Sequence, residues 1–318
     1  MLSLVFCACI SGVCAEMQGI AAACAAVRHG AADGLPRIAA FSGEPAPGAC
    51  LARIPCAMPH PAGSPLFPLT PALAQGYTAP MPRSALAFAT WNLHRARGAD
   101  GRVDPARSTA AILAAPDLAG ADVLALTEAE AEAPPYARLL DLVAIEKATG
   151  LCAVGLRWGP QSDGFLGTLL LLRPPLRPDW AAVVDLPGVY PRGAVVVELA
   201  SPSLRIIATH LSLVQALRIA QMRTLAQALA RRPAMPTVLV GDLNEWRPWG
   251  GLAFGAAVAG RTFTGPAHAT FPARLPLLPL DRILCDRPGA VTEARVLAAA
   301  PFRAASDHLP LVARVDPG

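Results

Sequence analysis

The sequence predicts an α/β protein in which two packed, mostly antiparallel sheets carry helices on their outer faces. Three observations support this fold class. Short apolar runs follow one another through the middle of the chain, with Pro/Gly-containing links that leave little room for crossover helices. Helical patterns lie on both sides of this middle. Polar residues stand where several strands end, and they could share one edge of the sheets.

The first patterned elements alternate between strand and helix. Residues 85–91 are an apolar run that predicts a strand. A helix is expected over residues 104–115, because Asp-Pro at its start is typical of an N-cap followed by proline at the first helical position. Residues 122–126 predict a second buried strand. A helix over residues 136–149 is then expected to end at Gly150, a suitable C′ glycine.

Strands dominate the rest of the chain. A meander of mostly antiparallel strands is predicted over residues 151–156, 166–172, 181–186, 194–199 and 204–209. Further strands are expected over residues 237–240, 281–285, 291–297 and 309–315. One long helix is expected over residues 214–231, because an apolar stripe runs along it. The stripe consists of Leu217, Met222, Leu225 and Leu229.

Composition indicates a globular protein. The chain is 53% hydrophobic and 16% charged, and no stretch reaches the roughly eighteen uninterrupted apolar residues of a spanning helix. We therefore expect no transmembrane segment. The net charge of +4 permits an anionic substrate without requiring one. We expect a monomer.

The first 80 residues show no useful helical or strand periodicity. Six of the eight cysteines fall within the first 56 residues, without the spacing of a zinc site. We interpret residues 1–80 as a leader or an over-extended reading frame, and residues 81–318 as the catalytic domain. A cytoplasmic protein is expected. Secretion is the alternative if residues 1–15 act as a signal peptide, although no positive residue precedes their apolar run.

Polar residues at the ends of strands form a candidate site. They are Asn92, Glu128, His210, Asp242, Asn244, Asp281, Asp307 and His308. Gathered carboxylates repel one another unless a cation or shared protons intervene. Oxygen ligands with amides favour Mg²⁺ or Mn²⁺, and such a site suits attack on phosphorus. Asp242 and Asn244 could instead form an Asx turn, and either histidine could be an ordinary buried one.

Six segments resemble the endonuclease/exonuclease/phosphatase superfamily over about residues 85–315. They read Thr-Trp-Asn-Leu-His (90–94), Leu-Thr-Glu (126–128), Thr-His-Leu (209–211), Gly-Asp-Leu-Asn-Glu-Trp (241–246), Leu-Asp-Arg-Ile (280–283) and Ser-Asp-His (306–308). The resemblance implies a four-layer α/β/β/α sandwich, which agrees with the two sheets predicted independently. It also implies Mg²⁺-dependent hydrolysis of phosphate esters, with a phosphodiesterase favoured and Mn²⁺ as an alternative ion.

The resemblance also implies roles by position. Glu128 matches the metal-binding glutamate, with Asn92 and Asp307 near the same ion. Asp242 and Asn244 match the pair that orients or deprotonates the attacking water and contacts the phosphate.

The two histidines match further positions of the superfamily. His308 matches the catalytic histidine, with Asp281 fixing its tautomer. His210 matches the histidine that contacts the scissile phosphate in the deoxyribonuclease and sphingomyelinase branches. Which group is the acid and which the base stays open. Arg192 could lend a guanidinium to the substrate, although a surface arginine in a turn is the favoured interpretation.

Two positions depart from the superfamily pattern, and the substrate stays open. Thr127 stands where a glutamine is usual, and Thr168 stands where an asparagine is usual. Nucleic acid, phospholipid and small phosphoesters are all candidate substrates. Residues 275–280 could be an exposed apolar loop of a lipid enzyme, or a buried edge strand interrupted by proline. The alternative to an enzyme is a non-catalytic phosphate- or nucleic-acid-binding protein on the same scaffold.

Overall fold

Two six-stranded sheets form the centre of the protein. A computed structural model describes residues 38–39, 85–316 and 318. In spatial order, sheet I contains β1 (Ile38–Ala39), β6 (Trp180–Leu186), β7 (Arg192–Leu199), β8 (Leu204–Thr209), β9 (Thr237–Asp242) and β10 (Asp281–Cys285). Sheet II contains β11 (Val291–Val296), β12 (Leu311–Val315), β2 (Leu86–Asn92), β3 (Val123–Thr127), β5 (Leu169–Leu172) and β4 (Cys152–Ala153). The pairs β8–β9 and β2–β3 are parallel, and the other pairs are antiparallel.

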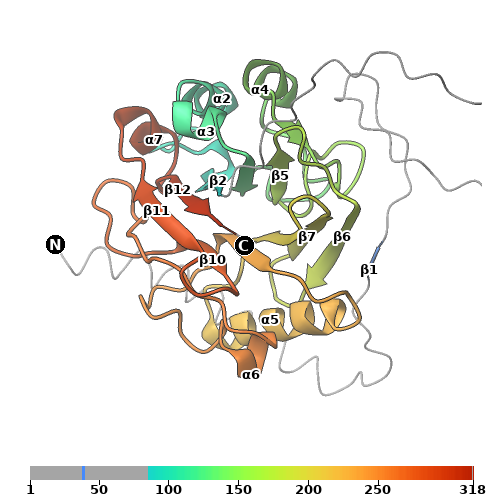
Figure 1. The fold of residues 1–318 in the computed structure, drawn as a ribbon. Helices are drawn as coiled ribbons and strands as arrows, with labels where there is room; N and C mark the ends of the chain where they lie inside the picture. The colour runs from blue at the N-terminus through green and yellow to red at the C-terminus, as the bar shows by residue number, and fades with distance from the viewer. Residues whose placement is uncertain (1–37, 40–84, 317) are drawn as a thin grey trace, which may run out of the picture.

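Helices cover the outer face of each sheet (Figure 1). Those over sheet II are α2 (Pro105–Leu113), α3 (Pro116–Ala119), α4 (Leu142–Thr149) and α7 (Ala300–Ala305). Those over sheet I are α5 (Gln215–Leu229) and α6 (Ala256–Ala259). The short 3₁₀ turn η2 (His94–Ala96) follows β2. The predicted four-layer α/β/β/α sandwich is therefore confirmed.

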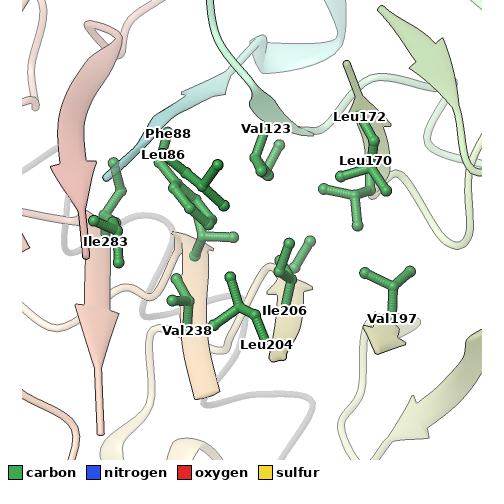
Figure 2. Close-up of a cluster of buried hydrophobic side chains, with 14 of the residues drawn as sticks. Leu86, Phe88, Val123, Leu170, Leu172, Val197, Leu204, Ile206, Val238 and Ile283 are labelled. Atoms are coloured by element: carbon green, nitrogen blue, oxygen red, sulfur yellow. The ribbon is translucent and has the colours of Figure 1, made fainter. Parts of the chain in front are cut away.

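The main core lies between the two sheets, as Figure 2 shows. Leu86 and Phe88 of β2 reach it from sheet II, and Ile206 of β8 and Val238 of β9 reach it from sheet I. Residues that alternate with these point outward; Trp91, for example, packs beneath the helices over sheet II. Both faces of the central strands are thus buried, which explains why the sequence shows continuous apolar runs there.

Helix boundaries follow local capping. The Asp104 side chain accepts a hydrogen bond from the Arg107 amide at 3.1 Å, so α2 begins where predicted. The second predicted helix begins later than residue 136, because the Asp141 side chain caps the Ala144 amide at 2.9 Å. It ends at Gly150, whose φ of 70° is the left-handed conformation expected at C′.

The predicted meander is divided between the sheets. Of its five strands, β4 and β5 belong to sheet II, and β6, β7 and β8 are consecutive neighbours in sheet I. β4 covers two of the six residues predicted as a strand. Periodicity locates such runs but does not report which sheet they join.

The first 84 residues lie outside the described part of the chain, apart from β1. This strand pairs with β6 through Ile38 opposite Val184 and Ala39 opposite Val183. The expectations for a leader, an over-extended frame or a signal peptide otherwise concern residues that the structure does not describe. Among the described residues, every helix is too short or too polar to span a bilayer.

Candidate active site

A histidine and two aspartates form the buried centre of the site. Asp242 ends β9 and Asp281 begins β10, and the two are paired in register. Asp281 Oδ2 lies 2.7 Å from His308 Nδ1, and it also accepts a hydrogen bond from Thr270 Oγ1 at 2.6 Å. The other ring nitrogen, Nε2, lies 3.9 Å from Asp242 Oδ2. His308 therefore has one nitrogen fixed by Asp281 and the other turned towards Asp242.

The two aspartates control the protonation of His308. Burial alone would lower the pKa of the ring, but the charges of Asp281 and Asp242 outweigh it and raise this pKa to about 10. Burial raises the pKa of Asp242 to about 6, although the positive charge of His308 opposes the shift. At neutral pH the site therefore holds an imidazolium next to carboxylates.

The turn after β9 places Asp242 and Asn244 together. Asp242 Oδ1 accepts a hydrogen bond from the Asn244 amide at 3.1 Å, which is the Asx turn considered from sequence. Oδ2 is left to face the rest of the site, so the turn and the site use different oxygens of one carboxylate. Gly241 has a φ of 135°, and a Cβ there would overlap the carbonyl oxygen of Thr209. Only glycine fits this position.

His210 is held neutral beside Asp242. Its burial, followed by the positive charges of Arg192, His308 and Arg95, lowers its pKa well below the usual value. Arg192 Nη1 contacts His210 Nδ1. A guanidinium only donates, so this contact requires Nδ1 to accept, which leaves the proton of a neutral ring on Nε2. Nε2 lies 3.3 Å from Asp242 Oδ2.

Arg192 therefore contacts a residue of the site. It opens β7 and reaches the site, contrary to the interpretation favoured from sequence. Its predicted role in substrate binding stays a prediction. Asn244 Nδ2 donates to the Leu211 carbonyl oxygen at 2.8 Å and lies 3.1 Å from His210 Nε2.

The residues predicted to hold a metal are only partly brought together. Asn92 Nδ2 donates to Asp242 Oδ2 at 2.8 Å and lies 3.4 Å from Glu128 Oε1. Asn92 Oδ1 accepts from the His94 amide at 2.8 Å. Asp307 lies further out, with a side chain 40% exposed and Oδ1 3.3 Å from His94 Nδ1. The structure thus gathers Asn92, Glu128 and Asp242 closely and places Asp307 at the rim.

The donor atoms of this site fit a hard divalent cation. Asp281 Oδ1 is a buried carboxylate oxygen without a hydrogen-bond partner within the described part of the chain. Glu128 Oε2 is paired with Arg95 Nη1 at 3.0 Å, and Asp307 Oδ1 lies 3.3 Å from His94 Nδ1. Carboxylate oxygens gathered in this way suit a hard cation such as Mg²⁺. Asp242, Asp281 and His308 also offer ligand atoms within 4.8 Å of one another. Within this second group, His308 and Asp281 already share a hydrogen bond.

Arg95 is a site residue that sequence reasoning missed. Its Nη1 lies 3.0 Å from Glu128 Oε2, and its Nη2 lies 3.6 Å from Glu132 Oε1. His94, Arg95 and Ala96 all have positive φ, between 48° and 58°. This left-handed turn aims Arg95 at the site, and no glycine or asparagine in the segment signals it.

Two further residues that contact the site were not among the polar residues predicted at strand ends. Thr270 bonds Asp281, and the ring of Phe271 lies 4.8 Å from the His308 ring, centroid to centroid. Both come from the long connection before β10 rather than from a strand end. Thr127 and Thr168, the two departures from the superfamily pattern, have buried hydroxyls without a hydrogen-bond partner in the described residues.

Fold and site together define a four-layer α/β sandwich with a carboxylate-held histidine at its sheet edge. The chain belongs to the Endonuclease/Exonuclease/phosphatase family, whose model matches residues 89–308. Members of this family are in general metal-dependent phosphoester hydrolases, and they usually use divalent metals.

Particular relatives support this membership. The uncharacterized protein YbhP of Escherichia coli is 31% identical over 163 residues, which cover 48% of this chain and 64% of that protein. An endonuclease/exonuclease/phosphatase structure from Beutenbergia cavernae is 25% identical with a TM-score of 0.51, covering 74% of this chain and 72% of the other. One from Bacteroides vulgatus is 16% identical with a TM-score of 0.57, covering 74% and 99%. The last similarity concerns the fold alone.

Proposed function

We propose that the protein is a Mg²⁺-dependent phosphodiesterase. The observation that carries this is the arrangement of His308, which is protonated, buried, fixed by Asp281 at 2.7 Å and turned towards Asp242. A positive donor beside a basic carboxylate is what hydrolysis of a phosphate ester needs.

Each residue has a role in this proposal. Asp242, with its pKa of about 6, is largely ionised at neutral pH and accepts a proton from the attacking water. His308, with its pKa of about 10, keeps its proton and donates it to the phosphate or the leaving oxygen. Asp281 accepts a hydrogen bond from Nδ1 and so holds the ring in that orientation.

The remaining polar residues are proposed to bind the phosphate or the metal ion. The phosphate oxygens would be held by three neighbouring side chains: neutral His210, Asn244 and Arg192. Glu128, Asn92 and Asp307 are proposed to hold Mg²⁺, with Mn²⁺ as a possible replacement. The bound ion would neutralise charge on the phosphate.

The test is a panel of phosphoesters assayed with Mg²⁺, with Mn²⁺ and with EDTA. The panel contains single- and double-stranded DNA, phospholipid, and small mono- and diesters. We expect turnover that EDTA abolishes and that Mg²⁺ restores, and a much lower rate in His308→Ala. Turnover unaffected by EDTA would remove the metal from the mechanism, and preference for monoesters would overturn the diesterase assignment.

A non-catalytic binding protein is the second candidate. The observation that favours it is the ion pair of Arg95 with Glu128, in which a guanidinium already compensates the proposed metal ligand. A binding protein would hold a phosphoester without turning it over. Equilibrium dialysis with a labelled diester, followed by product analysis, separates the two functions.

We also propose that the protein is a cytoplasmic monomer, with secretion through residues 1–15 as the alternative. Light scattering of the purified protein tests the oligomeric state. Fractionation of cells, together with N-terminal sequencing, tests the location.

A further inference from the structure

Two loops next to the active site expose large apolar side chains. The first loop follows β9 and carries Trp246, Trp249 and Leu252, of which Trp249 is 75% exposed. The second loop precedes β10 and carries Leu275 and Leu277, of which Leu275 is 63% exposed. Residues 275–280 form no strand; Leu275 and Leu277 are exposed, whereas Pro279 and Leu280 are buried. We call these five side chains the apolar rim.

A buried arginine joins the two loops. Arg282 is 1% exposed, and its Nε donates to the Pro279 carbonyl oxygen at 2.7 Å. Its Nη2 donates to the carbonyl oxygens of Glu245 and Arg247 at 3.2 and 2.8 Å. One planar guanidinium thus holds the backbone of both loops, so the apolar rim is a single surface rather than two independent loop tips.

The apolar rim is also tied to the catalytic residues. In the second loop, the ring of Phe271 packs on His308, and the Ala273 amide donates to the Asp307 carbonyl oxygen at 2.6 Å. The first loop begins at Asn244, two residues before Trp246. A partner bound to the apolar rim would therefore lie beside the active site.

The charge of this segment suits an anionic partner. Residues 246–280 contain three arginines and no aspartate or glutamate. Of the three, Arg274 is exposed and stands directly before Leu275. Arg247 and Arg261 are paired with Glu245 and Asp286.

We propose that the apolar rim docks the protein onto a phospholipid bilayer that contains anionic lipid. Tryptophan suits the boundary between headgroups and acyl chains, and the leucines suit the acyl side of that boundary. Single-stranded nucleic acid fits less well, because leucine does not stack on bases and a phosphate backbone requires more free cations than Arg274 alone. The proposal goes beyond the hydrolytic function and does not depend on it.

The experiment is co-sedimentation of the full chain with vesicles of phosphatidylcholine, with and without phosphatidylglycerol. The test variant is Trp249→Ser/Leu277→Ser. The matched control is Val143→Ser, which removes a side chain that is 72% exposed on α4, over the other sheet. Every protein carries residues 1–84, so any contribution from that segment is equal.

We expect the wild-type protein to bind vesicles that contain phosphatidylglycerol, and the test variant to bind at least about tenfold more weakly. The control should bind as the wild type does, and Arg274→Gln should reduce the preference for phosphatidylglycerol. Circular dichroism should be the same for all variants. Activity towards a small soluble phosphoester gives a separate reading of the proposed function.

Four results would overturn the docking proposal. The wild type could fail to bind vesicles, or the test variant could bind as tightly as the control. Binding of single-stranded DNA that is lost in the test variant would assign the apolar rim to nucleic acid. A wild-type dimer that the test variant abolishes would assign it to a second copy of the chain.

Discussion

His308 and Asp281 are expected to act as one unit, because a single hydrogen bond joins two buried groups. His308→Ala should lower kcat at least about a hundredfold, the scale of a lost acid–base group. Asp281→Asn should lower kcat by a smaller factor, because the imidazole itself remains. The double variant should be little slower than His308→Ala, since residues that act as a unit are non-additive. Multiplicative losses would show that the two side chains work independently.

The same pair predicts a change in the pH profile. The negative charge of Asp281 is the largest of the effects that raise the pKa of His308 to about 10. Without that charge, the ring loses its proton at a lower pH. The alkaline limb of kcat/KM in Asp281→Asn should therefore move to lower pH than in the wild type. A limb that stays in place would assign the titration to another group.

Glu128 is the residue on which the metal prediction depends most directly. Glu128→Gln replaces a carboxylate with a neutral amide of the same shape, so we expect Mn²⁺ affinity to fall at least about tenfold. Isothermal titration calorimetry measures this. Glu132→Gln is the matched control, because Glu132 also faces Arg95 but is 64% exposed. Equal affinities in the two variants would mean that the ion lies elsewhere.

At the scale of elements, a buried ion cluster supports the turn after β9. Arg218 of α5 and Arg247 both bind the Glu245 carboxylate, at 3.2 Å for Arg218 and at 2.7 and 2.8 Å for Arg247. Burial favours the neutral acid, but these two guanidiniums hold the pKa of Glu245 below its usual value. The cluster links the helix over sheet I to the residue next to Asn244, and so supports the geometry of the site.

Glu245→Gln should destabilise the fold, because it leaves the buried Arg218 guanidinium without its counter-charge. We expect a loss of about 3 kcal/mol in the free energy of unfolding, measured by urea titration. Asp117→Asn is the control. It breaks the pair of Asp117 with Arg295, both of which are substantially exposed, and should cost less than about 1 kcal/mol. Similar costs for the two variants would contradict a structural role for the cluster.

The boundaries of strands could be predicted from sequence where a local pattern of apolar residues determined them. Strands 204–209 and 281–285 agree with the structure at both ends. Each contains three consecutive apolar residues, 206–208 and 283–285, that are buried, as expected of strands covered on both faces. Most of the polar residues selected at strand ends also lie together in the structure, as the contacts of Asp242 with Asn92, His210 and His308 show. Arg95 could not be found in this way, because its position depends on a left-handed turn without sequence signals. Arg218 was missed because an arginine on an amphipathic helix is usually exposed.

At the scale of the whole molecule, the boundary near residue 81 stays a prediction. A truncated protein that begins at Met81 should fold and keep its kcat, because every site residue lies beyond it and β1 adds only two residue pairs at the edge of sheet I. Circular dichroism and the phosphoester assay measure this. Loss of folding in the truncated protein would make residues 1–80 part of the domain.

The pairing of Asp242 with Asp281 across β9 and β10 bears on how this scaffold can diversify. The Leu243 amide donates to the Leu280 carbonyl oxygen at 2.9 Å, so the long connection leaves and re-enters the sheet at adjacent points. Insertions or deletions between its anchors do not change the strand register that opposes the two aspartates. Loop exchange within residues 274–277 is therefore a route to new substrate preferences that leaves Asp242, Asp281 and His308 in place.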